Sequence, residues 1–368
     1  TLAIDRADES VAHLYDPLHP AVLQLVANTI AECRAQGKDV SVCGEMAGDT
    51  TLNATSITFN APVTGSGALH VSGLSTMNGG SVTTAGAQNY TAAMTLGADT
   101  TLDAGASAVT LGGTVDGAHS LTVNTTGTTR FNAAVGDTMP LRCLTTNAGG
   151  MVLIDTASVQ TTGTQTFHDM VSLIGNTTLT GSSVTFNQAV MSAGDLSVVG
   201  QAVLNAGTVN TSGAQHYSSA ITLMRDTVLT AGQADVNFGN TVNGAHALTV
   251  NTGGVTTFGG VVGGSTALTR LTIDAVTGGS VVVNGGSVTT TGTQNYGQAL
   301  RLNGDTTLTA LDVSFGKAVT GTGNLNVVGT SVIYGGQVST TGTQAYSDTL
   351  TLGANTTLAS TAGTLNFE

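Results

Sequence analysis

Short runs in which apolar and polar residues alternate recur along most of the chain. Examples are SITF at 56–59, ALHV at 68–71 and LTV at 121–123, each bounded by Gly, Asn, Asp or Ser. Alternation with a period of two places Leu, Val, Ile and Phe on one face of a strand and Thr, Ser and Asn on the other. No window of helical length survives after Thr50, because Gly and β-branched residues interrupt each candidate. The pattern therefore predicts short β-strands over residues 50–368.

Two short words repeat along this segment with one alternating spacing. The first word is small-Gly-small-Gln-x-aromatic, and its Gln residues, spaced 77, 50, 79 and 50 apart, are Gln88, Gln165, Gln215, Gln294 and Gln344. The second is [DN]-T-[TV]-L, and its last residues, spaced 50, 77, 50, 79 and 50 apart, are Leu52, Leu102, Leu179, Leu229, Leu308 and Leu358. Both spacings share a divisor near 25, which we interpret as one coil. The fold predicted for 50–368 is a right-handed parallel β-solenoid (β-helix) with coils of about 25 residues.

Composition agrees with a stacked coil and excludes several other classes. Only 8% of the 368 residues are charged, and like charges stacked every ~4.8 Å would repel one another, whereas Asn and Thr form ladders. The 50 Gly follow no three-residue period, which excludes collagen, and no apolar run is long enough to predict a membrane span. Three Cys are too few for a disulfide scaffold. A net charge of −13 argues against a nucleic-acid partner.

These averages conceal a boundary after Asp49. Residues 1–49 contain 11 charged residues and three Gly, whereas 50–368 contain 20 charged residues and 47 Gly. The first part predicts a short α/β fragment. One helix starts at Pro20 and ends before Gly37, and one strand covers 40–43, with Cys-Gly-Glu at its carboxyl end. We therefore predict two domains, 1–49 and 50–368.

The long segment resembles the repeat region of secreted bacterial proteins of the filamentous-haemagglutinin type. The residues that carry the resemblance are the T-G-T-Q-x-Y words and the runs GADTTL and GAHSLTVNT. The resemblance implies a non-catalytic surface adhesin or stalk, outside the cell or on the outer membrane. Host or cell-surface glycans or proteins, and neighbouring coils, would be its partners.

The short segment resembles the carboxyl-terminal barrel of enzyme I, the phosphoenolpyruvate-protein phosphotransferase. The runs TLAIDRADESVAHLYDPLHPAVLQL and VSVCGEMAGD carry this resemblance. It implies that Arg6 contacts the substrate phosphate and that Cys43 donates a proton to the enolate carbon, in a cytoplasmic parent enzyme. The family's phosphorylated His and its Mg²⁺ ligands are missing, so we expect no cofactor, no metal site and two inert residues. A D-T-T-L word shared by both segments at the boundary suggests recombination or an assembly error. The initial Thr and both ends suggest a fragment.

Residues inside the repeat each have a structural and a functional interpretation. His119 and His246 are turn residues or metal ligands, and the Asp residues of D-T-T-L (Asp99, Asp226, Asp305) are caps or calcium ligands. We call the small-Gly-small-Gln-x-aromatic word the Gln tag. Its Gln is a buried or laddered residue at a coil corner, or a sugar contact. Cys143, which aligns with Arg270, is expected at an unconstrained surface position. In each case the structural interpretation is favoured.

Three functions therefore compete at this stage. The favoured one is the adhesin or stalk, and the alternative is an enzyme I fragment that transfers phosphate from phosphoenolpyruvate. A solenoid polysaccharide lyase or hydrolase would need paired carboxylates or an Arg-and-calcium cleft. The 20 charged residues of 50–368 are spread evenly and form no such cluster in the sequence.

Overall fold

The computed structural model describes residues 3–4, 12–14, 39–274 and 278–368. The chain divides into two compact units, Thr1–Ser182 (unit 1) and Ser183–Glu368 (unit 2). The described residues form strands and contain no helix, so no helix among them is long and apolar enough to cross a membrane. The helix predicted between Pro20 and Gly37 lies outside the described residues.

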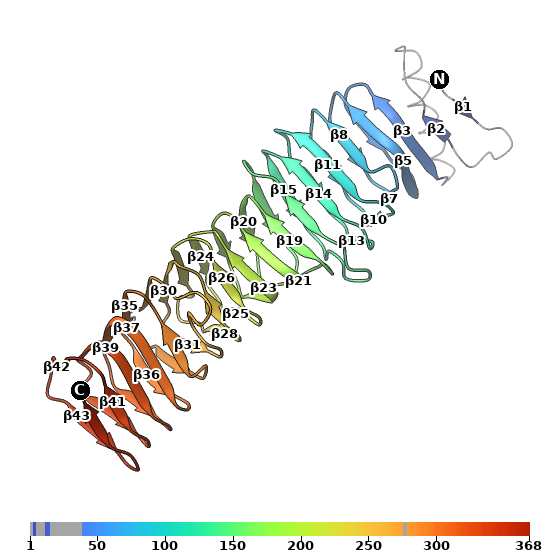
Figure 1. Cartoon of the computed structure of the whole chain (residues 1–368). Helices are drawn as coiled ribbons and strands as arrows, with labels where there is room; N and C mark the ends of the chain where they lie inside the picture. Colours follow the sequence, from blue (N-terminus) through green and yellow to red (C-terminus); the bar gives the residue numbers. More distant parts are fainter. Residues whose placement is uncertain (1–2, 5–11, 15–38, 275–277) are drawn as a thin grey trace. The chain divides into compact units, whose positions relative to one another are not determined.

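Short strands joined by turns make up both units (Figure 1). The strands of unit 1 are β1 (Ala3–Ile4), β2 (Ala12–Leu14), β3 (Val40–Met46), β4 (Thr50–Leu52), β5 (Ser56–Gly65), β6 (Leu69–Val71), β7 (Leu74–Met77), β8 (Ser81–Thr84), β9 (Gln88–Tyr90), β10 (Met94–Leu96), β11 (Thr100–Gly105), β12 (Val109–Leu111), β13 (Val115–Asp116), β14 (Leu121–Thr125), β15 (Thr128–Phe131), β16 (Leu144–Thr146), β17 (Met151–Ile154), β18 (Ser158–Gln160), β19 (Thr164–Phe167) and β20 (Met170–Leu173). Strand β21 (Thr177–Phe186) crosses the division between the units. The strands of unit 2 are β22 (Val190–Ser192), β23 (Leu196–Leu204), β24 (Thr208–Thr211), β25 (Gln215–Tyr217), β26 (Ile221–Leu223), β27 (Thr227–Thr230), β28 (Val236–Phe238), β29 (Val242–Asn243), β30 (Ala247–Asn251), β31 (Val255–Phe258), β32 (Arg270–Ile273), β33 (Ser280–Val283), β34 (Ser287–Thr289), β35 (Thr293–Tyr296), β36 (Ala299–Leu302), β37 (Thr306–Phe315), β38 (Val319–Gly321), β39 (Leu325–Ile333), β40 (Gln337–Thr340), β41 (Gln344–Tyr346), β42 (Leu350–Leu352), β43 (Thr357–Ser360) and β44 (Leu365–Phe367).

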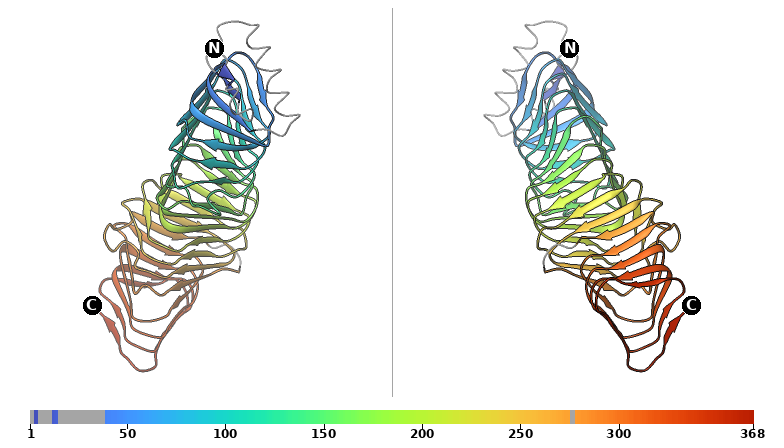
Figure 2. Two further views of the ribbon diagram at one scale, coloured as in Figure 1. Left: turned by 90° about the vertical axis from the view of Figure 1, so that its right-hand side faces the viewer. Right: turned by 90° about the vertical axis from the view of Figure 1, so that its left-hand side faces the viewer.

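Each unit is a parallel β-solenoid, as the sequence predicts. Strands of successive coils pair in parallel, and the pairs line up into three columns per unit, so each coil has three faces (Figure 2). One column of unit 1 runs through inward residues of six consecutive pairs: Leu52, Val71, Tyr90, Leu111, Phe131, Ile154 and Leu173. The handedness of the coil stays a prediction.

Most coils are shorter than the repeat spacing predicts. In unit 1, Asn89 bonds to its partner His70 on the preceding coil, a separation of 19 residues. In unit 2, the Ala247 amide bonds to Asp226 on the preceding coil, a separation of 21 residues. The divisor of 25 was wrong because a repeat unit does not contain a whole number of coils. A coil of three short strands and three tight turns needs only about 20 residues.

This mismatch moves the Gln tag from face to face. Within unit 2 the tag aromatic Tyr217 pairs with Val198 and Phe238, Tyr296 with Ile273 and Phe315, and Tyr346 with Val327 and Phe367. These pairs belong to three different columns. The three copies of the Gln tag in unit 2 therefore place their aromatic residues on three different faces of the coil.

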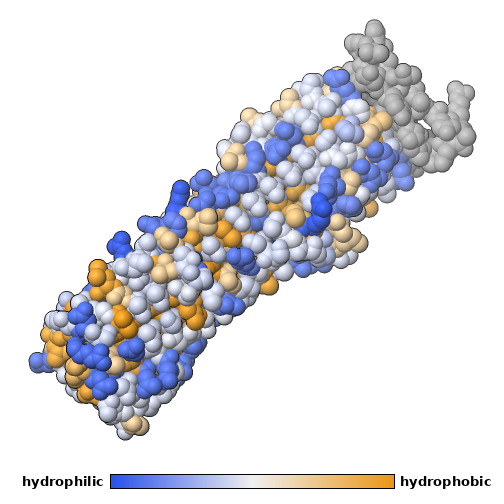
Figure 3. All heavy atoms as spheres, viewed as in Figure 1, coloured by the Kyte–Doolittle hydropathy of each residue, from blue (hydrophilic) through white to orange (hydrophobic). Residues whose placement is uncertain are grey.

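The inward positions form a thin core that runs along each unit. Val, Leu, Ile and Phe at these positions are almost all fully buried, and the largest buried side chains are Tyr and Phe. In unit 2 the ring of Phe238 stacks on Tyr217 at 5.9 Å and on Phe258 at 5.0 Å, nearly parallel to both. The outward positions are mostly Thr, Ser and Asn, and the face in Figure 3 is largely of intermediate hydropathy.

Glycine allows the chain to turn a corner inside a long strand. Strand β39 lies on two faces, and Gly329 at its bend has a φ of 112°. A Cβ at Gly329 would lie 2.0 Å from the Ala310 carbonyl oxygen, so no other residue fits there. Its neighbour β37 shifts register between Thr309 and Asp312 at the same corner. Corner Asn residues form the predicted ladders, for example from Asn303 Nδ2 to Asn284 Oδ1 at 2.7 Å.

The described residues of the N-terminal segment join the stack. They include three strands, and β3 confirms the strand predicted at 40–43 but continues to Met46. Strand β3 pairs in parallel with β5, with a register shift between Val42 and Gly44 that leaves Cys43 at the irregularity and Gly44 opposite Val63. The Cys-Gly-Glu run therefore lies within a strand, not beyond its carboxyl end as the sequence suggested.

Candidate functional site

The Gln tag is a buried hydrogen-bonding centre, as its structural interpretation predicts. All five tag Gln side chains are fully buried at the start of a strand. Gln88 Nε2 donates to the Val82 carbonyl at 3.0 Å and to the Asp103 carbonyl at 2.8 Å. Those two residues lie on neighbouring strands β8 and β11, so the amide joins two successive coils. The other four Gln residues donate to the carbonyls at the same offsets, six residues before and 15 after.

The tag is longer than the sequence word suggested. The tag Tyr hydroxyl donates to the Gln Oε1, at 3.0 Å for Tyr296 and Gln294, and burial raises the pKa of the Tyr296 hydroxyl, so it stays protonated. Four residues before each Gln, a Thr hydroxyl donates to the Gly carbonyl of the turn, as Thr290 does to Gly292 at 3.0 Å. The sequence analysis missed this Thr, although it recurs in all five copies: Thr84, Thr161, Thr211, Thr290 and Thr340.

One copy of the tag lacks a bond that the others make. Phe167 occupies the position of the Tyr, and the buried Gln165 Oε1 has no hydrogen-bond partner among the described residues. We expect Phe167→Tyr to stabilise the chain by about 1 kcal/mol, because the new hydroxyl supplies the missing donor. Chemical denaturation followed by circular dichroism measures this. Phe131→Tyr, at a buried ring outside any tag, is the control and should be destabilising. Equal effects of the two substitutions would contradict the assignment.

The Asp residues of D-T-T-L hold the turns of the next coil, which agrees with their predicted capping role. Asp226 Oδ1 accepts the Ala247 amide at 2.9 Å, and Asp305 Oδ1 accepts the Asn324 amide at 2.8 Å. At Asp99 the Ser120 amide, with help from Arg142 and His119, lowers the pKa of the carboxyl.

The two repeated His residues lie in turns, as predicted. His119 Nδ1 lies 3.7 Å from Asp99, and His246 Nδ1 lies 3.6 Å from Asp226. In the parts of the chain that the structure describes, no group of three His, Cys, Asp or Glu side chains is placed to hold a metal ion. Cys143 is half-buried.

Asp169 is a buried carboxylate in the short connection between β19 and β20 of unit 1. Its Oδ1 accepts the Gly150 amide at 2.7 Å, while its buried Oδ2 has no hydrogen-bond partner among the described residues. Burial raises the pKa of this carboxyl. The repeat places Gln298 at the corresponding position in the next pair of repeat units, where its Nε2 donates to the Thr252 carbonyl.

We therefore expect Asp169→Gln to stabilise the chain at neutral pH by about 1 kcal/mol, because it removes a buried charge. The folded pKa is raised, so the native state favours the protonated acid. The contribution of the Asp169 carboxyl to the free energy of unfolding is fully present below about pH 4. It is lost as the pH rises through the pKa of the folded state. Melting curves between pH 4 and pH 8 should show an advantage of the variant that grows with pH. The exposed Asp137→Asn is the control, and an advantage independent of pH would contradict the burial effect.

Cys43 and Arg6 are the residues that the enzyme I resemblance singles out. Cys43 lies in β3, half-buried, and desolvation raises the pKa of its thiol. Its neighbour Glu45 is exposed. Arg6 lies outside the described residues, so its contact with the substrate phosphate stays a prediction.

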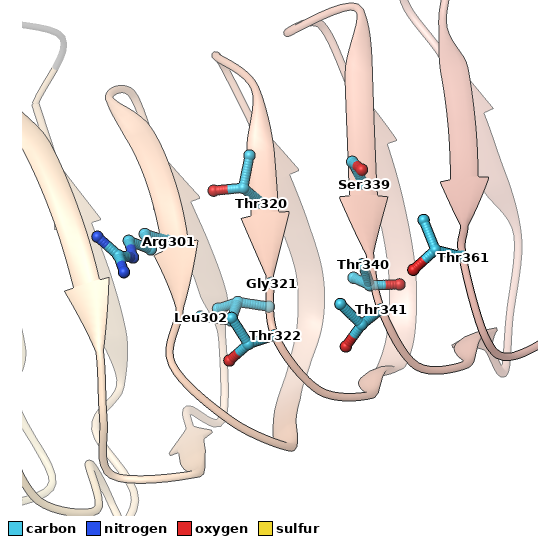
Figure 4. Close-up of a pocket in the computed structure, with 9 residues that line it drawn as sticks. All are labelled: Arg301, Leu302, Thr320, Gly321, Thr322, Ser339, Thr340, Thr341 and Thr361. Atoms are coloured by element: carbon cyan, nitrogen blue, oxygen red, sulfur yellow. The ribbon is translucent and has the colours of Figure 1, made fainter.

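A hollow of about 280 Å³ lies on the outer surface of unit 2 (Figure 4). Its lining residues come from β36, β38, β40 and the residues that follow β38, β40 and β43: Arg301, Leu302, Thr320, Gly321, Thr322, Ser339, Thr340, Thr341 and Thr361. Arg301, Thr320 and Ser339 are in register on three successive coils, and all three face outward. The sequence analysis did not single out this hollow.

Comparison with known proteins bears on the N-terminal part alone. Residues 1–60 match the family model described as PEP-utilising enzyme, PEP-binding domain. The chain is 71% identical over 52 residues to the phosphoenolpyruvate-protein phosphotransferase of Cupriavidus necator, which covers 14% of this chain and 9% of that protein. It is 51% identical over 49 residues to the same enzyme of Haemophilus influenzae (13% and 8%), and 49% identical over 51 residues to that of Lactococcus lactis subsp. lactis (14% and 9%). The chain thus spans less than a tenth of the length of these relatives. No solved structure matches it significantly.

The chain therefore joins two kinds of sequence: an N-terminal segment that matches the PEP-binding domain of PEP-utilising enzymes, and a β-solenoid. The match reaches residue 60, beyond the predicted boundary at Asp49, and the parallel pairing of strands already includes β2 and β3, ahead of that boundary. Residues 40–60 thus belong both to the matched region and to the coils of unit 1.

Proposed function

We propose that the solenoid is the repeat segment of a secreted or cell-surface bacterial protein that works as an adhesin or stalk. The observation that supports this proposal is the structural role of the repeated word. In each copy of the repeated word the Gln is buried, and the aromatic residue of the word packs in the core. The repeated chemistry therefore builds a scaffold, and the outward Thr, Ser and Asn positions remain for contact with a partner.

The adhesin proposal is tested with the full chain immobilised on beads. We expect these beads to be retained under flow on epithelial monolayers or on extracellular matrix, while beads coated with albumin detach. Retention equal to that of albumin on every surface would contradict an adhesive role. It would leave a purely structural stalk.

An enzyme I fragment is the second candidate, and the family match over residues 1–60 favours it. In that function Cys43 protonates the enolate carbon and Arg6 holds the substrate phosphate. We expect the intact chain with magnesium to release no more pyruvate from phosphoenolpyruvate than its Cys43→Ala variant. Turnover that depends on Cys43 would establish the enzymatic alternative.

A further inference from the structure

Arg301 breaks the pattern of the repeat at one outward position. Seven residues after each tag Gln, four of the five copies have a small hydroxyl side chain: Thr95, Ser172, Thr222 and Thr351. The copy that begins at Gln294 has Arg301 there instead. A guanidinium thus replaces a hydroxyl at a single place in a chain with a net charge of −13.

Arg301 lines the hollow together with several Thr and Ser residues. Among the described residues Arg301 forms no ion pair and no hydrogen bond, and none of the residues that line the hollow is acidic. The hydroxyls of Thr320, Ser339, Thr322 and Thr341 likewise have no partner within the described chain. Figure 4 shows Arg301, Thr320 and Ser339 on neighbouring strands, with Thr322, Thr341 and Thr361 gathered where the strands end.

Leu302, Gly321 and Thr340 also line the hollow. Gly321 pairs with Leu302 on one side and with Thr340 on the other, and both of those side chains are buried. A Cβ at Gly321 would lie 3.2 Å from Thr340 Cγ2 and 3.4 Å from Leu302 Cβ, so the glycine leaves the space between these two side chains unfilled. The volume of about 280 Å³ is just below the range for ligand pockets, about 300–1,000 Å³, so it suits one small unit of a larger molecule.

We propose that this hollow binds a carboxylated sugar unit of a glycan. A guanidinium recognises a planar carboxylate through two parallel hydrogen bonds, and Thr and Ser hydroxyls both donate to and accept from the hydroxyls of a sugar ring. The carboxylate of the sugar binds Arg301, and the hydroxyls of Thr320 and Ser339 contact its ring. This inference rests on the adhesin proposal and names the ligand class of that surface.

Titration calorimetry on the full chain tests the proposal with four probes. Trigalacturonate and sialyllactose carry the carboxylate on a uronate and on a sialate, and so distinguish the two sources. The methyl ester of trigalacturonate lacks the charge, and inorganic sulfate is an anion without a ring. We expect binding of at least one carboxylated probe, at least tenfold weaker binding of the methyl ester, and no binding of sulfate alone.

Two variants with the same change of charge separate the site from the overall field of the protein. Arg301→Gln should weaken binding of the carboxylated probe at least tenfold, whereas Arg270→Gln, at an exposed strand position outside the hollow, should leave it unchanged. Thr320→Val, which keeps the shape but removes a hydroxyl, should weaken it a few-fold. Absence of binding by both carboxylated probes, equal loss in both Arg variants, or equal binding of the methyl ester would each overturn the proposal. Retention of the coated beads together with no carboxylate binding refutes this site and leaves the adhesin proposal standing.

Discussion

Gln294→Leu should destabilise unit 2 by about 3 kcal/mol, although the two side chains are similar in size. Gln294 is fully buried, and its Nε2 donates to the Val288 carbonyl at 3.0 Å and to the Thr309 carbonyl at 2.9 Å. Its Oε1 accepts the Tyr296 hydroxyl. The substitution leaves these groups buried without partners, and each such group costs about 1–3 kcal/mol. The penalty arises from unpaired polar groups and not from lost volume.

The control for this experiment is Gln337→Leu, at an exposed position of the same unit. Guanidinium denaturation followed by circular dichroism compares the midpoints of the two variants with that of the parent chain. Hydrogen exchange in addition reports whether the amides of β35 and β37 lose protection first, since solenoid stability is a sum of local terms. Equal midpoints for the two variants would show that the buried tag is not a structural centre.

Phe238→Ala should cost about 3–5 kcal/mol, the range for truncation of a buried aromatic ring. Phe238 is stacked between Tyr217 and Phe258 on successive coils, so its removal opens a cavity inside a core that is only one side chain deep on each face. A thin core has few neighbours that can move in to fill such a gap.

Leu311→Ala is the matched control, because Leu311 is an apolar side chain of the same unit that is 69% exposed. We expect the thermal midpoint to fall by several degrees for Phe238→Ala and to change little for Leu311→Ala. Phe238→Leu should lie between the two. A similar small change for all three would contradict a continuous stacked core.

The solenoid architecture was predictable because apolar and polar residues alternate with a period of two along the strands. Inward residues such as Val71 and Val123, with polar neighbours on either side, already mark one buried face. The scarcity of charge likewise follows from stacking in register. The coil length could not be predicted from the repeat spacing. A repeat unit does not contain a whole number of coils, so successive copies of a word lie on different faces.

The same mismatch hid the partners of the tag. That Gln294 is buried was predictable from its regular occurrence beside an aromatic residue, but its acceptors Val288 and Thr309 become neighbours only when the coil length is known. Corners were hidden for another reason: β37 and β39 turn between faces inside one unbroken run of strand residues. Arg301 was visible in the sequence as the exception among the five copies, yet its unpaired neighbours required the structure.

The register of the coils is tested most directly by cysteine cross-linking. Thr320 and Ser339 are side-by-side partners on successive coils, within the Cα separation that a disulfide spans. With Cys33, Cys43 and Cys143 replaced by Ser, we expect mild oxidation of Thr320→Cys/Ser339→Cys to close a disulfide that mass spectrometry detects. Thr320→Cys/Ala345→Cys, a pair that the longer coil predicted from the repeat would place side by side, should remain reduced. A disulfide in the second pair and none in the first would contradict the three-faced coil and its register.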